Sequence, residues 1–293
     1  MADTGLILKG VGGFYTVLSD NGTEIVCRAR GRFRKDGITP VVGDRVEYVE
    51  DGEGRSVSKI LPRRNIFIRP AVANLDKLII VASLSAPKPD LMLMDKLIIR
   101  CEKHNVEPVI VLNKCDQADA DAAEDIRAQY APAGYTIITA SAAKGDGVDA
   151  IKAEIAGNIC CFAGQSAVGK SSLINAIVPE LALETGGLSR KTDRGRHTTR
   201  HAQLWHVCGG AVLDTPGFSL LEADEMEPKE LCECYREMRG KRIIGCRFGE
   251  CLHRSEPDCA VKPLIGTALS PERYERYLII LDELIEKRKH KYD

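Results

Sequence analysis

Hydrophobic and polar residues follow different patterns in successive parts of the chain. Between Val11 and about Pro70 they alternate in short stretches, FYTVL, EIVCRARG, DRVEYVE, SVSKIL and NIFIRP, which are separated by the turn-forming sequences DNG, RKDG and EDGEG. Alternation of this kind is typical of strands that bury one face. We therefore predict an all-β domain over residues 1–70, a five-stranded barrel of the OB-fold type, although periodicity alone does not separate it from other small barrels.

From about Leu75 the pattern changes to apolar strand-like stretches, LIIVAS, PVIVLNK, YTIITAS and ICCFAG, which alternate with helix-like ones. This alternation predicts an α/β domain with a parallel sheet over residues 71–221. Residues 222–293 are helical in pattern, contain a Cys/His-dense segment and end in a long helix-like stretch, for which Pro271 is a suitable first-turn residue. We predict a C-terminal helical domain there.

A glycine-rich segment between the strand-like NICCFA and the helix-like SSLINAIV fits the phosphate-loop pattern G-x-x-x-x-G-K-[ST]. Its glycines let backbone N–H groups face phosphates, its lysine reaches the β and γ phosphates, and the serine directly after that lysine, Ser171, can ligate Mg²⁺. A strand-to-helix turn with a chance lysine is the alternative, but the flanking elements favour the phosphate loop. The predicted loop comprises Gly164, Gln165, Ser166, Ala167, Val168, Gly169, Lys170, Ser171 and Ser172.

A second motif, NKCD, directly follows the strand-like PVIVL. Its aspartate can accept hydrogen bonds from guanine N1–H and the exocyclic amine, whereas adenine has no donor at the equivalent nitrogen, so such a site discriminates by ~10⁴ or more. NKCD alone could be a polar strand end, but together with the phosphate loop it predicts GTP in preference to ATP. SAAKG, after YTIITA, resembles the loop that backs the base. The predicted base-binding residues are Asn113, Lys114, Cys115, Asp116, Ser141 and Ala142.

The sequence DTPG follows the strand-like GAVL and predicts the element that senses the γ-phosphate, with Asp214 near Mg²⁺ and the Gly217 N–H facing the phosphate. Between the phosphate loop and DTPG lies GLSRKTDRGRHTTR, a polar segment suited to a mobile switch. Its threonine would complete the Mg²⁺ shell, and Thr198 and Thr199 both stay open as that ligand.

Phe218 follows DTPG, where Ras-like enzymes have the glutamine that orients the attacking water. Because a phenyl ring cannot hold water, we expect intrinsic hydrolysis to be slow and a partner to stimulate it. The candidate catalytic residues are Lys170 and His197. The alternative for His197 is a structural or RNA-facing role in the switch.

The motifs occur in the order NKCD, SAAKG, GQSAVGKSS, HTT, DTPG, which is circularly permuted relative to most GTPases. With the N-terminal β pattern and the C-terminal Cys/His segment, the whole chain resembles the ribosome small-subunit-dependent GTPases of the RsgA (YjeQ) family. This resemblance implies an OB-fold, a permuted GTPase domain and a zinc domain. It also implies GTP and GDP as ligands, and a role in late maturation of the 30S subunit.

Four cysteine and histidine residues near the C-terminus have the spacing C-x4-C-x-H-x5-C. This spacing favours one structural Zn²⁺ with tetrahedral coordination and no open coordination position. The four residues are Cys246, Cys251, His253 and Cys259. Four unrelated residues are the alternative, and the nearby Cys232 and Cys234 could compete as ligands. The chain has 11 cysteines, an odd number, and no export signal is evident, so disulfide pairing is a poor interpretation.

Composition limits the function less than the motifs do. The 41 basic and 42 acidic residues nearly cancel, so a polyanion would have to bind at local basic patches. One such patch is CRARGRFRK, and at alternate positions of a strand its arginines would share one face; they are Arg28, Arg30, Arg32 and Arg34. A solvated face is the alternative, but an OB-like domain together with the family resemblance favours RNA contact, and the resemblance implies 16S rRNA as the partner.

No apolar run is long enough to cross a bilayer, so we expect a cytoplasmic protein without a membrane partner. As a separate expectation, the chain acts as a monomer. Two other functions stay open. One is a zinc-stabilised RNA-binding module in which the nucleotide only controls affinity. The other is a GTPase that acts on tRNA or in metabolism.

Overall fold

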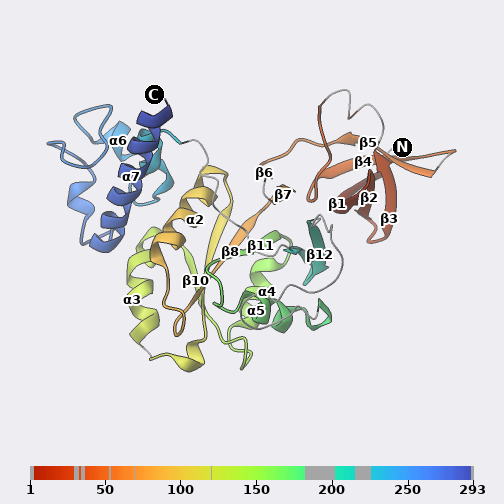
Figure 1. Cartoon of the computed structure of the whole chain (residues 1–293), viewed down its shortest axis with the longest axis horizontal. Helices are drawn as coiled ribbons and strands as arrows, with labels where there is room; N and C mark the ends of the chain where they lie inside the picture. Colours follow the sequence, from red (N-terminus) through yellow and green to blue (C-terminus); the bar gives the residue numbers. More distant parts are fainter. Residues whose placement is uncertain are drawn as a thin grey trace.

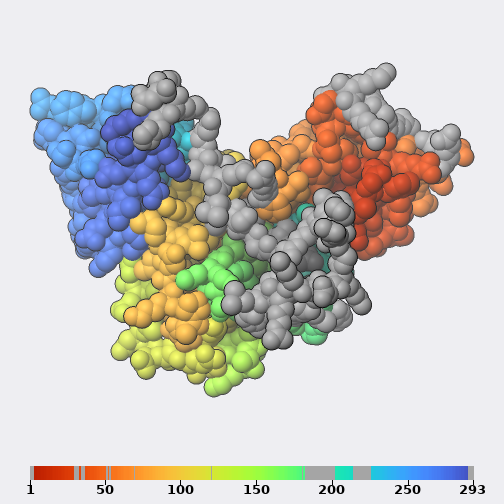
Figure 2. All heavy atoms as spheres, viewed as in Figure 1, coloured from red at the N-terminus to blue at the C-terminus, as the bar shows by residue number. Residues whose placement is uncertain are grey.

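The chain has three parts arranged along its long axis, with the N-terminal strands at one end and the C-terminal helix at the other (Figure 1). Figure 2 shows the two end parts as separate lobes that flank the central part, both toward the upper edge of the view. The computed structural model describes residues 3–29, 33, 37–52, 54–68, 70–119, 121–181, 202–214 and 226–291. Among these residues no helix combines the length and the apolar character needed to cross a membrane.

The N-terminal part is a five-stranded barrel. Strand order is β1-β2-β3-β5-β4, and pairing of β1 with β4 closes the barrel. All neighbouring strands are antiparallel except β3 and β5. The alternating pattern directs one set of side chains inward, including Ile7, Tyr15, Val17 and Val57, and confirms the predicted OB-like barrel. The strands are β1 (Asp3–Val11), β2 (Phe14–Ser19), β3 (Glu24–Ala29), β4 (Arg45–Asp51) and β5 (Gly54–Ile60).

The central part is a sheet in the order β10-β9-β8-β11-β13-β12, parallel except for β12. Helices α2 and α3 contribute to the apolar core on one face, and α4 and α5 to the core on the other. The predicted α/β architecture is thereby confirmed. The elements are β8 (Lys77–Ser83), α2 (Leu91–Lys103), β9 (Glu107–Asn113), α3 (Asp121–Tyr130), β10 (Thr136–Thr139), α4 (Val148–Ile155), β11 (Ile159–Ala163), α5 (Lys170–Ile177), β12 (Gln203–Val207) and β13 (Gly210–Asp214).

A short hairpin of β6 (Ile66–Ile68) and β7 (Ala71–Ala73) connects the barrel to the central sheet. Asn74 follows this hairpin and donates through Nδ2 to the Gly43 carbonyl oxygen in the barrel, at 2.9 Å. The two sheets also meet edge to edge, because Lys9 of β1 pairs with Gln203 of β12. The expected boundary at residue 70 lies in the turn of the hairpin.

The C-terminal part consists of short helical turns and one long helix. They are η4 (Pro228–Cys234), α6 (Lys241–Ile244), η5 (Lys262–Leu264) and α7 (Pro271–Lys291), and α7 begins at the proline predicted for its first turn. Shorter 3-10 turns of the central part are η1 (Cys115–Gln117), η2 (Ala131–Ala133) and η3 (Pro179–Leu181). The C-terminal core also includes Ile99 and Met92 of α2, so this part packs directly on the central domain.

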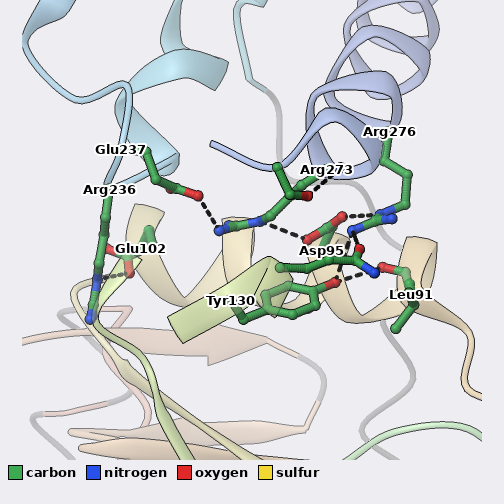
Figure 3. Close-up of polar contacts among 10 residues, drawn as sticks. Leu91, Asp95, Glu102, Tyr130, Arg236, Glu237, Arg273 and Arg276 are labelled. Carbon is green, nitrogen blue, oxygen red and sulfur yellow. Dashed lines mark hydrogen bonds and ion pairs between the residues drawn. The ribbon is translucent and has the colours of Figure 1, made fainter. Parts of the chain in front are cut away.

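Buried charges join α7 to the central domain (Figure 3). The Arg273 guanidinium lies between the carboxylates of Asp95 in α2 and Glu237, and Nε of Arg273 is 3.2 Å from Oδ1 of Asp95. Arg273 is only 1% exposed. Rings of Tyr130 and Tyr235 each have their centroid 4.9 Å from the guanidinium carbon. Arg276 contacts Asp95 and also donates to the Tyr130 hydroxyl, at 3.3 Å. A largely buried ionic and aromatic contact therefore holds α7 against α2 and α3.

Candidate functional site

Three of the sequence motifs meet at one edge of the central sheet. The parallel strands β10, β9, β8 and β11 lie side by side, with Ser83 of β8 opposite Asn113 of β9 and Thr139 of β10 opposite Leu112. NKCD, SAAKG and the glycine-rich loop follow the carboxyl ends of β9, β10 and β11. Carboxyl ends of parallel strands are where open α/β sheets bind ligands.

The glycine-rich loop requires glycine at two positions. Gly164 has φ +135°, and a Cβ there would lie 2.1 Å from the Val81 carbonyl oxygen. Gly169 has φ +96°, and a Cβ there would lie 2.3 Å from the Asn113 Nδ2 atom. Helix α5 begins immediately after it, so the first N–H groups of that helix face the loop. Strand, tight loop and helix N-terminus together form an anion-binding arrangement.

Lys170 is the first residue of α5, and its ammonium group folds back into the loop. Nζ donates to the carbonyl oxygens of Gly164 and Gln165, at 2.9 and 2.6 Å. Burial lowers the pKa of Lys170 below its ordinary value. Ser171 and Ser172 follow in the first turn of α5 and are half-buried. The amine thus sits where it could exchange carbonyl oxygens for the oxygens of a bound phosphate.

The Asn113 side chain connects the three motifs. It is buried, its Nδ2 donates to the Val168 carbonyl oxygen at 2.8 Å, and its Oδ1 accepts the Ala142 N–H at 3.2 Å. Lys114 adds a second link, because Nζ donates to the carbonyl oxygens of Ala167, at 2.9 Å, and of Ala86. The two side chains thereby fix the phosphate loop relative to the residues after β9 and β10.

Asp116 presents a carboxylate at the same edge. Its Oδ1 accepts a 2.7 Å hydrogen bond from the buried Ser141 hydroxyl, and this bond lowers the pKa of Asp116. The carboxylate is therefore ionised at neutral pH and held in one orientation. Cys115 is half-buried, with a thiol pKa that is raised by burial, and its backbone N–H donates to the Ala140 carbonyl oxygen at 3.1 Å. A carboxylate in this position is chemically able to accept hydrogen bonds from guanine N1–H and the exocyclic amine.

Several predicted residues cannot be placed. The last residue of β13 is Asp214, and β13 lies next to β11, but the Asp214 side chain is outside the described part of the chain. The predicted residues that lie wholly outside it are His197, Thr198, Thr199, Gly217, Phe218, Arg30, Arg32 and Arg34.

The segment after β8 supports the site, although the sequence did not predict this role. The Ala86 carbonyl oxygen accepts from Lys114, and the Ser85 hydroxyl donates to Gln117 Oε1 at 3.3 Å, so this segment supports the NKCD loop. Its sequence, LSAP, carries no motif, and only its position at the end of the neighbouring strand could have indicated the contact.

The four predicted metal ligands form a compact cluster in the C-terminal part. Their ligand atoms all lie within 4.8 Å of one another. Nδ1 of His253 is 3.6 Å from Cys246 Sγ, 3.4 Å from Cys251 Sγ and 3.3 Å from Cys259 Sγ. A tetrahedral Zn²⁺ with ordinary bond lengths requires about 3.5 Å between nitrogen and sulfur, so the donor set fits this ion. Cys232 and Cys234, the possible competitors, lie in the C-terminal core and do not belong to the cluster.

Hydrogen bonds around the cluster fix its loop. The Glu256 carboxylate accepts the N–H groups of Leu252, Arg254 and Ser255, at 2.7 to 3.0 Å. From α7, the Tyr274 hydroxyl donates to the His253 carbonyl oxygen at 2.6 Å. The ligand loop and α7 therefore support each other.

The phosphate-loop and guanine motifs stand in permuted order on one parallel sheet. A β-barrel precedes this sheet and a Cys3His cluster follows it. Together these features define a circularly permuted GTPase with two accessory domains. The sequence matches the RsgA N-terminal domain over residues 4–57 and the RsgA GTPase domain over residues 60–224. The chain belongs to the RsgA family of GTPases, as its sequence predicted.

Relatives and solved structures agree along nearly the whole chain. A Small ribosomal subunit biogenesis GTPase RsgA from Ruminiclostridium cellulolyticum is 44% identical over 280 residues, which cover 94% of this chain and 91% of the relative. The same-named protein of Caldanaerobacter subterraneus is 44% identical and covers 98% of both chains. The crystal structure of YjeQ from Thermotoga maritima is 35% identical, with a TM-score of 0.84, covering 97% of this chain and 99% of that one. The crystal structure of YloQ, a circularly permuted GTPase, is 35% identical with a TM-score of 0.83, and the match covers 98% of this chain and 96% of that one.

Proposed function

We propose that this chain binds GTP with Mg²⁺, hydrolyses it to GDP and phosphate, and acts in late assembly of the small (30S) ribosomal subunit. The main support for nucleotide binding is the Asn113 side chain, which bonds both Val168 of the phosphate loop and Ala142. This connection lies at the same edge of the sheet as the Asp116 carboxylate. The ribosomal part is supported by relatives at 44% identity, which are named small ribosomal subunit biogenesis GTPases.

In this proposal the loop N–H groups and Lys170 bind the β and γ phosphates, and Asp116 binds guanine. Ser171 would hold Mg²⁺, with Asp214 nearby and either Thr198 or Thr199 completing the shell. The ion would offset phosphate charge as the γ-phosphoryl group leaves. Support comes from the start of α5 at Lys170, which places the Ser171 hydroxyl in the first helical turn.

We assign three domains to the chain, residues 1–70, 71–221 and 222–293. The third would hold one structural Zn²⁺ through Cys246, Cys251, His253 and Cys259. Support comes from the three nitrogen to sulfur distances of 3.3 to 3.6 Å, and from a donor set that leaves no position for a substrate.

The flanking domains would bind 16S rRNA while GTP is bound, and the chain would act as a monomer. Support comes from the two lobes that flank the nucleotide-binding domain (Figure 2) and from the exposed Arg28 on the barrel. Phe218 in place of glutamine implies slow unassisted hydrolysis, with His197 as the candidate group that acts once the subunit orders the switch.

Co-sedimentation with purified 30S subunits tests this proposal. The full chain is mixed with subunits in the presence of a non-hydrolysable GTP analogue, GDP, or the matching ATP analogue. We expect recovery with the subunits to be high with the GTP analogue and low with GDP or the ATP analogue. Equal recovery in all three conditions would show that the guanine nucleotide does not control ribosome binding.

A further inference from the structure

Helix α2 is shared between two apolar cores. Its residues Met94 and Leu97 are buried in a core of the central domain. Ile99 of the same helix is buried in the core of the C-terminal part, and Met92 packs against that core. A shift of α2 would therefore disturb the packing of both parts of the chain.

Asp95 is the buried charge through which the C-terminal part holds the first turns of α2 (Figure 3). Its side chain is 0% exposed and forms ion pairs with Arg273, at 3.2 Å, and with Arg276. Arg276 also donates to the Tyr130 hydroxyl, which in turn donates to the carbonyl oxygen of Leu91, the first residue of α2, at 3.4 Å. Because an uncompensated buried charge is costly, the Asp95 carboxylate stays with its two cations. The position of α7 therefore fixes the start of α2.

The segment that leads into α2 supports the NKCD loop. Residues 84–90 join β8 to α2; they are only seven, and two of them are prolines, which restrict the backbone. Within this segment the Ala86 carbonyl oxygen accepts from Lys114 Nζ, and the Ser85 hydroxyl donates to Gln117 Oε1 at 3.3 Å. These two partners stand directly before and after the Cys-Asp pair of the motif. A short, stiff connection thus links the start of α2 to both sides of the base-reading carboxylate.

We propose that Asp95 is a positioning residue for guanine recognition. By fixing α2 against α7 it fixes residues 84–90, and through them the loop that carries Asp116. The proposal rests on the proposed function, since it presupposes that Asp116 binds guanine. It adds that the C-terminal part controls guanine affinity, although none of its residues is assigned to the nucleotide site. Because coupling between sites is reciprocal, bound nucleotide would strengthen the contact of α7 with α2 by the same factor.

The alternative is an ion pair that stabilises the fold and nothing more. A loss of global stability weakens the apparent binding of every nucleotide by one common factor, because the unfolded chain binds none of them. A displaced NKCD loop instead costs guanine more than a base that makes fewer hydrogen bonds to Asp116. Inosine is such a base, since it keeps N1–H but lacks the exocyclic amine. The ratio of the Kd values for IDP and GDP therefore separates a positioning role from a structural one.

The test measures this ratio on the full chain, by displacement of a GDP that carries a fluorophore on its ribose. Circular dichroism first establishes a temperature at which each variant is folded. Asp95→Asn, which keeps the volume and removes the charge, is expected to weaken GDP binding roughly 2- to 30-fold and to lower the ratio of IDP to GDP Kd values. Arg276→Met leaves Asp95 paired with Arg273 and should change the ratio in the same direction. If Asp95→Asn does not fold, Arg276→Met decides the result.

Glu283→Gln is the matched control, because it breaks a 2.8 Å ion pair with Lys96 between the same two helices. The side chains of this pair are 40% and 43% exposed, and the variant should keep the wild-type ratio. GDP and IDP binding that weaken by one common factor, or a wild-type ratio in the folded variants of Asp95 and Arg276, would overturn the proposal. An equal change of the ratio in Glu283→Gln would overturn it as well. If the wild-type chain itself does not prefer GDP to IDP, the proposed guanine recognition fails, and that result is read without any variant.

Discussion

Replacing Arg273 by methionine should destabilise the contact between α7 and the central domain. The change leaves Glu237, whose side chain is 1% exposed, without its cationic partner, and removes one of the two cations that contact Asp95. Breaking a buried ion pair by removing one partner lowers the free energy of unfolding by about 3–5 kcal/mol, because the remaining charge stays buried. The guanidinium also leaves the Tyr130 and Tyr235 rings, which places the effect toward the upper part of this range.

Urea unfolding followed by far-UV circular dichroism measures this loss. With a slope of about 2–3 kcal/mol per molar urea, the midpoint should fall by roughly 1–2 M. The matched control is Arg288→Met on the same helix, which removes a 2.8 Å ion pair with Glu227. The side chains of this pair are exposed, Arg288 to 54% and Glu227 to 46%. This change should lower the free energy of unfolding by about 1 kcal/mol or less. Similar midpoints for the two variants would show that the buried contacts of Arg273 do not stabilise the fold more than an exposed ion pair does.

The loss should also depend on pH. Burial raises the pKa of Glu237, and Arg273 opposes this effect, so the pKa should rise further in Arg273→Met. A carboxyl whose folded-state pKa is raised binds more protons in the folded state, so stability falls as pH rises through that value. Arg273→Met should therefore recover part of its lost stability relative to wild type when the pH is lowered from neutral toward the ordinary carboxyl range. A loss that is constant with pH would show that Glu237 is not the charge left unpaired.

Asp116→Asn should weaken GTP binding and favour xanthine nucleotide, because the amide turns a donor toward guanine N1–H; unchanged GTP affinity in a competition assay would exclude Asp116 as the base reader. Cys251→Ser should reduce metal content from about one zinc per chain to near zero and make the C-terminal part sensitive to protease, while GTP binding persists. Zinc retained at full content would point to a different fourth ligand. His197→Ala should remove most of the 30S-stimulated turnover with GTP affinity nearly unchanged, and full stimulated turnover would mean that another group acts.

The nucleotide loops could be predicted because local geometry restricts their residues. Gly164 and Gly169 adopt positive φ against a neighbouring backbone or side chain, so few sequences other than the motif form this loop. The metal cluster could also be predicted from the sequence, since all four ligands lie within fourteen residues, Cys246 to Cys259, and a short loop brings them together.

Contacts between distant segments could not be read from the sequence. Asn113 bonds Val168, 55 residues away, and the motif alone does not show that its amide holds the phosphate loop. Arg273 stands in a charged helix, PERYERYLIILDELIEKRKHK, where an arginine is expected to face solvent, yet packing of α7 on α2 buries it. For β2, both faces of FYTVL carry apolar residues, so only the closed barrel shows that Phe14 is outward.

GTP turnover with and without purified 30S subunits shows whether this chain is a GTPase that the small subunit stimulates. Phosphate release is followed at saturating GTP while 30S subunits are added, with 50S subunits and ATP as matched controls. We expect a basal rate on the order of the ~10⁻⁴ per second of an unassisted Ras-like site and a large increase with 30S subunits alone. A rate that stays flat as 30S subunits are added, or one that rises equally with 50S subunits, would contradict it.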